Sequence, residues 1–300
     1  MENRRDFIKK VGLSTLSLST FAKLAHAMPA AARPFFEISL AQWSLHKSLF
    51  GGKLSNLDFP AKAKNEFGID IVEYVSVFFQ KKETDKNYLK DLKQRSDDLG
   101  VRNHLIMVDG EGDLGDVDVV ARQKAVENHY KWVDAAKFLG CKTIRVNASG
   151  KGAKEAVGEA AVDGLSKLTA FAKAQKINVI VENHGGYSSD GKWLSEVMKK
   201  VNSPYCGTLP DFGNFKISAT EQYDLYKGVE ELMPFAKGVS AKTFNFDSKG
   251  DEPDIDYYRL FDIIKKSGWK GIVGIEYEGD KVSESEGIRL TKKLLEKVRG

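Results

Sequence analysis

Short apolar runs alternate along the chain with longer stretches of mixed polarity. The runs, many of them rich in β-branched residues as buried parallel strands are, lie at 36–40, 69–74, 101–107, 143–146, 177–181, 207–209, 238–241 and 271–275. Between them, apolar residues recur at helical spacing. Several of these stretches end at a glycine, as at Gly100 and Gly140, where helices commonly stop. The pattern predicts eight strands, each followed by a helix.

Eight βα units without a dividing linker favour a single α/β domain over residues 28–300. A closed (β/α)₈ barrel, the TIM barrel, is the predicted fold, since eight parallel strands fit a chain of this length. The alternative is an open doubly wound sheet, which typically carries a glycine-rich phosphate loop. Neither GxGxxG nor GxxxxGK[ST] opens a helix here.

Residues 1–27 have the features of an export signal. Twin arginines, Arg4 and Arg5, precede a mild apolar run over 11–24 and the small-residue site Ala25-His26-Ala27. The arrangement resembles a bacterial twin-arginine signal, so we expect cleavage after Ala27 and a periplasmic protein. An amphipathic N-terminal helix is the alternative. The run is too short and polar to span a bilayer, and no cysteine follows it for lipid attachment, so no membrane anchor is expected.

The basic character of the chain is concentrated in that segment. The sequence pI is about 8.7, but residues 1–27 carry a net charge of +3 out of the chain's +4. The near-neutral remainder lacks the basic surface that nucleic-acid binding requires. A small-molecule partner is therefore expected, and homo-oligomerisation is left open.

Polar residues follow each predicted strand. Because barrel active sites form at the carboxyl ends of strands, we expect these residues at one mouth. They are Gln42, Trp43 and His46; Glu73; Asp109 and Glu111; Arg145 and Asn147; Glu182, Asn183 and His184; Asp211 and Asn214; Lys242 and Asn245; Glu276 and Glu278. Singly, each is a typical solvated loop residue.

Three carboxylates stand out from this set. Glu182, Asp211 and Glu276 each end an apolar run, on strands that adjoin or nearly adjoin in a barrel. Three mutually repelling carboxylates at one mouth need a cation or shared protons. We therefore predict that they hold one divalent cation.

These motifs resemble the xylose isomerase-like TIM-barrel superfamily of sugar (phosphate) isomerases and epimerases, which also includes endonuclease IV. The resemblance covers residues 35–300. In that family a metal-binding Glu ends the fifth strand, an Asp the sixth and a Glu the eighth. They correspond to Glu182 in "VENHGG", Asp211 in "DFGN" and Glu276 in "GIEYEG".

The chain departs from the family pattern at two positions. The seventh strand of the family carries H-x-K, with the His as a metal ligand, but this chain has Ser240-Ala241-Lys242. The family's His three residues after the Asp is Asn214 here. An oxygen-rich site prefers hard ions such as magnesium, manganese or calcium. His184 either replaces the missing ligand or contacts substrate, and loss of the metal is a further alternative.

The resemblance implies a sugar isomerase or epimerase that removes a proton next to a carbonyl. Glu182 and Glu276 would then transfer protons, and Lys242 would stabilise the oxyanion. The residues expected to bind substrate are Gln42, Trp43, His46, Glu73, Asn147, His184 and Asn214. Two alternatives stay open: a lyase or hydratase acting on oxidised sugars or glycosides, and a non-catalytic sugar-binding barrel. A histidine-rich zinc nuclease is disfavoured, because only His46, His104, His129 and His184 follow the signal.

The two cysteines should not form a disulfide. Cys141 and Cys206 precede the fourth and sixth predicted strands. Two strand steps of about 4.8 Å separate them, which exceeds the Cα distance of about 7 Å that a disulfide tolerates. We expect both to be buried thiols.

Overall fold

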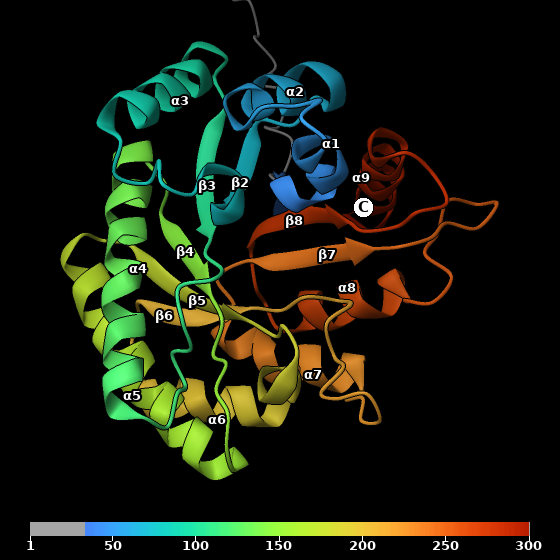
Figure 1. Cartoon of the computed structure of the whole chain (residues 1–300). Coiled ribbons are helices and arrows are strands. Elements are labelled where there is room, and N and C mark those ends of the chain that lie inside the picture. Colours follow the sequence, from blue (N-terminus) through green and yellow to red (C-terminus); the bar gives the residue numbers. More distant parts are fainter. Residues whose placement is uncertain (1–33, 300) are drawn as a thin grey trace, which may run out of the picture. The chain divides into compact units, whose positions relative to one another are not determined.

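The computed structural model describes residues 34–299, so the predicted export signal lies outside the described residues. Within that range, eight parallel strands pair in the order β6-β5-β4-β3-β2-β1-β8-β7 (Figure 1). The strands are β1 (Phe36–Ala41), β2 (Ile71–Val75), β3 (Arg102–Met107), β4 (Thr143–Val146), β5 (Asn178–Glu182), β6 (Cys206–Leu209), β7 (Val239–Thr243) and β8 (Gly271–Tyr277). The predicted (β/α)₈ barrel is confirmed.

The barrel closes between β6 and β7 through short bridges rather than a full ladder. Asp211 pairs with Ser240, and the Ser240 N–H donates to the Pro210 carbonyl at 2.9 Å. The Phe212 N–H donates in return to the Ser240 carbonyl at 3.2 Å. The closure therefore places Asp211, a predicted site residue, directly beside Ser240.

Helices surround the ring of strands (Figure 1). They are α1 (His46–Phe50), α2 (Phe59–Phe67), α3 (Lys86–Asp98), α4 (Val119–Leu139), α5 (Lys154–Ala174), α6 (Gly191–Val201), α7 (Leu225–Leu232), α8 (Tyr257–Lys266) and α9 (Glu284–Arg299). None of the helices in this part of the chain is long and apolar enough to cross a bilayer.

Aspartates fix the start of many of these helices. Before α3, α4, α6, α7 and α8, a carboxylate accepts a hydrogen bond from a backbone N–H of the first turn, which satisfies groups that the helix leaves unpaired. The five caps are Asp85, Asp118, Asp190, Asp224 and Asp256. These acidic groups follow the strands, as the site residues do, but their role is structural. The predicted stops Gly100 and Gly140 adopt left-handed backbone, with φ of 65° and 85°.

Two apolar clusters stabilise the barrel. The larger lies between strands and helices and includes Trp132, Phe59 and Phe261. The smaller fills part of the barrel interior and consists of Ala41, Val75, Leu105, Met107, Ile180 and Leu209. Its members belong to β1, β2, β3, β5 and β6. Of the three strands that contribute none, β4, β7 and β8, the last two are neighbours. The interior beside those two strands is left to polar groups.

Both cysteines are buried free thiols, as predicted. Burial raises the pKa of Cys141 to about 12 and that of Cys206 to about 11. Each thiol therefore stays protonated, and protein shields it from reagents.

Thiol titration should distinguish the native from the unfolded chain. At pH 8 the native protein should react with a disulfide reagent about 10²-fold more slowly than the unfolded chain, because thiolate is scarce. Unfolding without reductant should release two thiols per chain. Recovery of none would show that the cysteines are paired and would contradict the strand arrangement.

Candidate active site

Three carboxylates converge at the carboxyl end of the barrel. Glu182 ends β5, Asp211 follows β6 and Glu276 lies near the end of β8. All three are buried, and one oxygen from each lies within 4.8 Å of the others. The predicted convergence is confirmed.

Ser240 occupies the position where the family pattern has a metal-binding His. Its Oγ lies 2.6 Å from Asp211 Oδ2 and 3.2 Å from Glu276 Oε2. The hydroxyl thus bridges two of the three carboxylates. A serine keeps a polar contact at this position but contributes a neutral oxygen in place of an imidazole nitrogen.

Lys242, on β7, is the cation that pairs with the carboxylates of and after β8. Its Nζ lies 3.1 Å from Glu276 Oε1, 3.0 Å from Glu278 Oε1 and 3.8 Å from Asp211 Oδ2. The side chain is only 2% exposed. Burial alone would lower the pKa of Lys242, but the surrounding carboxylates outweigh it and hold that pKa well above its usual value. Lys242 is therefore a permanent ammonium group and not a base.

Arg145, on β4, is the cation that pairs with Asp109 and with Glu182 at the end of β5. Its guanidinium donates to Asp109 Oδ1 at 2.7 Å, and Asn147 donates to the same oxygen at 2.7 Å. Burial tends to raise the pKa of Asp109, but Arg145 and Asn147 bring it below its usual value. Arg145 Nε also lies 2.8 Å from Glu182 Oε2, while Asn214 donates to Glu182 Oε1 at 2.9 Å.

One oxygen of this cluster has a charge partner but no hydrogen bond. Glu182 Oε2 and Arg145 Nε are close enough for an ion pair, yet neither has a partner with hydrogen-bond geometry among residues 34–299. Distance alone supports the ion pair; the direction of the N–H excludes the hydrogen bond. A buried carboxylate oxygen is thus left free to bind another group.

Glu73 lies beneath the three carboxylates. Ser39 Oγ donates to its Oε1 at 2.6 Å, and a Cβ at Gly274 would meet its Oε2 at 2.8 Å. Gly274 therefore leaves space for this carboxyl group. Burial, aided by the charges of Glu276 and Glu182, raises the pKa of Glu73 to about 7 against the Ser39 hydrogen bond.

The donor set fits a hard divalent cation. It consists of carboxylate oxygens, one of them without a hydrogen bond, and the Ser240 hydroxyl, which are the ligands that magnesium, manganese and calcium prefer. Burial raises the pKa of Asp211 well above its usual value despite Lys242. A divalent cation would reverse that shift. His184 is not a member of the converging group in residues 34–299, so the alternative in which it replaces the missing metal ligand is not supported.

A cavity of about 450 Å³ opens above the carboxylates. Among the predicted residues, Trp43, His184, Asn214, Lys242 and Glu276 line it. Asp109, Arg145 and Glu278 line it too. These three were noted at strand ends but not included in the predicted site, because a strand-end position alone does not separate a site residue from a solvated one.

The other predicted substrate-binding residues do not line this cavity. Gln42 is buried; its amide donates to Asn56 at 2.6 Å and accepts from the Val75 N–H at 2.9 Å. Asn147 holds Asp109 in place. His46 stacks on Trp43, with ring centroids 5.0 Å apart. Each positions a neighbour of the cavity rather than facing it. Glu73, also predicted to bind substrate, is buried away from the cavity against Ser39.

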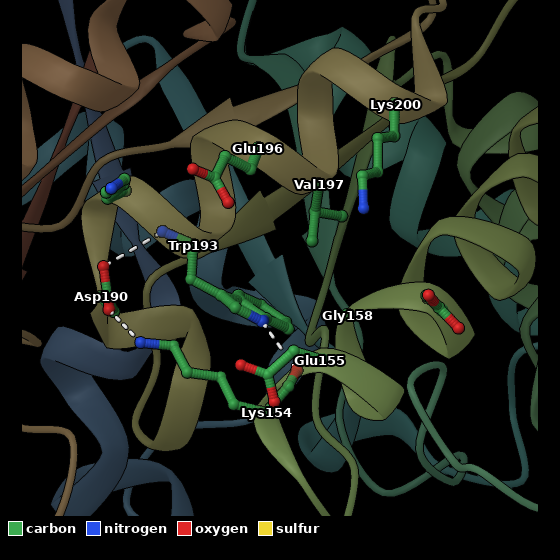
Figure 2. Close-up of a pocket in the computed structure, with 10 residues that line it drawn as sticks. Lys154, Glu155, Gly158, Asp190, Trp193, Glu196, Val197 and Lys200 are labelled. Carbon is green, nitrogen blue, oxygen red and sulfur yellow. Dashed lines mark hydrogen bonds and ion pairs between the residues drawn. The ribbon is translucent and has the colours of Figure 1, made fainter.

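Figure 2 shows a second hollow, between α5 and α6. Asp190 accepts from the Trp193 N–H at 3.0 Å and pairs with Lys154, whose carbonyl accepts from Trp193 Nε1 at 3.1 Å. The central polar groups of this second hollow thus bond one another. The hollow shares no lining residue with the cavity above the carboxylates.

Comparisons with known proteins agree with this geometry. The profile of the family described as "Xylose isomerase-like TIM barrel" matches residues 61–298. The chain belongs to this family. No curated protein sequence matches the chain. The profile alone shows the family, and the solved structures below share the fold.

Three solved structures illustrate that likeness. An IOLI protein with a zinc atom is 16% identical, with a TM-score of 0.67 over 87% of this chain and 98% of its own. D-psicose 3-epimerase with D-tagatose from Clostridium cellulolyticum is 12% identical, with a TM-score of 0.68 over 88% and 99%. A xylose isomerase-like protein from Mycobacterium smegmatis with magnesium is 14% identical, with a TM-score of 0.65 over 88% and 96%.

Without metal, the stability of the barrel should fall as pH rises from about 4.5 to 7. The pKa of Glu73 is about 7 in the folded protein, against 4.5 for an ordinary glutamate. The protonated carboxyl therefore stabilises the fold fully below pH 4.5. This stabilisation is lost as the pH rises through the folded pKa. The loss amounts to about 3 kcal/mol. Glu73→Gln should remove that part of the decline in chelator-treated protein.

Urea unfolding at a series of pH values measures this effect. Glu37→Gln is the control, because Glu37 is an exposed glutamate that pairs with Arg102. Superimposable profiles for Glu73→Gln and the parent protein would contradict the assignment of a proton to Glu73.

Proposed function

We propose that this protein is a sugar isomerase or epimerase that removes a proton next to a carbonyl with the help of a divalent cation. The observation that carries the proposal is the convergence of Glu182, Asp211 and Glu276 in one buried cluster beneath a cavity. Structures sharing the fold include D-psicose 3-epimerase and a D-tagatose 3-epimerase-like protein, which is consistent with this chemistry.

The three carboxylates and Ser240 would hold the cation. When bound, it would supply positive charge against the oxyanion that develops on the sugar carbonyl. Asp211, which pairs with Ser240 where β6 and β7 close the barrel, would serve as a ligand only. Lys242, which lines the cavity, provides a second positive charge for the oxyanion.

Glu182 and Glu276 would move the protons, because they come from strands on different sides of the cluster: Glu276 lines the cavity, and Glu182 lies in the buried cluster beneath it. Glu182 belongs to β5 and Glu276 to β8, with β6 and β7 between them. Burial tends to raise the pKa of Glu276, but Lys242 and Arg145 hold it below its usual value. Glu276 is therefore ionised and able to accept a proton, while Glu182 can return one to the other face of the carbon.

A lyase or hydratase acting on oxidised sugars is the second candidate, and Glu278 favours it. Glu278 lines the cavity, and burial, against the charge of Lys242, raises its pKa above the usual value. A raised pKa makes the protonated form of a carboxyl group more available, and that form can protonate a leaving group after the α-proton has been removed. Formation of an unsaturated product would identify this reaction.

Glu182→Gln and Glu276→Gln should each reduce deuterium exchange from heavy water into a substrate sugar by at least about 10²-fold, since a carboxamide cannot act as a base. Mass spectrometry across a panel of keto- and aldo-sugars measures the exchange. Glu296→Gln is the matched control: Glu296 lies on α9 beside Glu37, at the amino end of β1, and its exchange should equal that of the parent.

Unchanged melting temperatures would confirm that all three variants fold. Full exchange in either site variant would assign the base to another residue. Chelation should abolish exchange in the parent protein, and magnesium or manganese should restore it.

We also propose export by the twin-arginine route, with a sugar of the periplasm as partner and no nucleic acid. The support is the Arg4-Arg5 pair and the small-residue site at 25–27.

Removal of residues 1–27 should leave the melting temperature within about 2 °C of the full chain, because the barrel strands and their helix caps all lie beyond this segment. Differential scanning calorimetry of both forms provides the measurement. A larger drop would mean that the segment stabilises the barrel and is not a disposable signal.

A further inference from the structure

The cavity above the carboxylates has two unlike walls. One is apolar and consists of Trp43, Val75, Val77 and Met107. The other is charged and consists of Asp109, Arg145, Lys242, Glu276 and Glu278. A sugar ring has apolar C–H faces and hydroxyl edges, so it can contact both walls at once.

The apolar wall continues outward as a cluster that we call the aromatic rim: Trp43, Phe50 and Phe78. Ring centroids lie 6.0 Å apart for Trp43 and Phe78, 6.0 Å for Trp43 and Phe50, and 5.0 Å for Phe50 and Phe78. Trp43 and Phe78 are half-buried and pack on the interior cluster. The rim therefore joins the apolar wall of the cavity to the surface.

Phe50 is the outermost member of the rim. It ends α1 and is 62% exposed, so burial in the core does not account for it. Single exposed apolar side chains are common, and Phe138 on α4, 40% exposed, is one of them. Phe50 differs because it extends an apolar surface that begins inside the cavity.

The charges at the mouth disfavour an anionic substrate. Leaving out Glu73, which burial favours in its neutral form, five carboxylates surround two cations, Arg145 and Lys242. They are Asp109, Glu278 and the buried triad. Both cations are paired, Arg145 with Asp109 and Glu182, and Lys242 with Glu276 and Glu278. Even with a divalent cation bound, negative charge remains in excess, and none of the described lining residues offers an unpaired ammonium or guanidinium group to a phosphate.

Given the proposed function, we infer that the substrate is an uncharged oligosaccharide or glycoside rather than a monosaccharide or a sugar phosphate. The reacting ring lies between the charged wall and Trp43. The second ring or aglycone stacks on Phe78 and Phe50 of the aromatic rim. Specificity thus depends on a surface outside the cavity.

Deuterium exchange into matched sugars tests this inference. The probes are D-fructose, the disaccharides lactulose and palatinose, which keep a fructose carbonyl free, and D-fructose 6-phosphate. The kcat/KM of the better disaccharide should exceed that of fructose by about tenfold, and the phosphate should fall below fructose by a similar factor. Phe50→Ala should lower the disaccharide-to-fructose ratio about three- to tenfold.

Two further variants serve as controls. Phe50→Trp keeps an aromatic face and should retain the ratio, and Phe138→Ala removes an exposed ring elsewhere and should not change it. An unchanged ratio in Phe50→Ala, or preference for the phosphate, would overturn the inference while leaving the proposed function intact. Absence of exchange into any sugar would overturn both.

Light scattering separates a substrate surface from a subunit contact. The parent and Phe50→Ala proteins should have the same mass at the same concentration. Conversion of an oligomer to a monomer by Phe50→Ala would show that the aromatic rim binds a second copy of the chain, and the inference would fail.

Discussion

Repulsion among buried carboxylates constrains the mouth of this barrel. Glu182, Asp211 and Glu276 lie within a few ångströms of one another with Glu73 beneath them, where low dielectric strengthens every charge interaction. Lys242 and Arg145 offset part of the cost, each from one side of the cluster. The remaining repulsion raises the pKa values of Asp211 and Glu73, and it favours binding of a divalent cation.

The fold accommodates this arrangement where the barrel closes, between β6 and β7. β6 and β7 are joined by isolated bridges, and one of these places Asp211 beside Ser240. On β8, Gly274 leaves room for the Glu73 carboxyl. The residues in register with Gly274 on the flanking strands are Ser39 of β1 and Ser240 of β7. Small residues there make space for charge in an interior that larger apolar side chains fill on the opposite side.

Much of this could be predicted from the sequence, because hydrophobic period and strand ends are local signals. Glu182, Asp211 and Glu276 each follow an apolar run, and the topology of a barrel brings such residues together. Residues whose role depends on distant partners could not be ranked in this way. Gln42 has the same position after a strand as the site residues, yet its amide bonds Asn56 and Val75. The aromatic rim had no signal, since Phe50 and Phe78 meet only in three dimensions.

The central claim is that the carboxylate triad is a cation site, and anomalous X-ray diffraction from crystals soaked in manganese tests it most directly. A single strong peak is expected within about 2.6 Å of oxygens from Glu182, Asp211 and Glu276, and it should be absent in crystals of Asp211→Asn. If the soaked parent crystals showed no peak there, and Lys242 alone balanced the triad, the account would be contradicted.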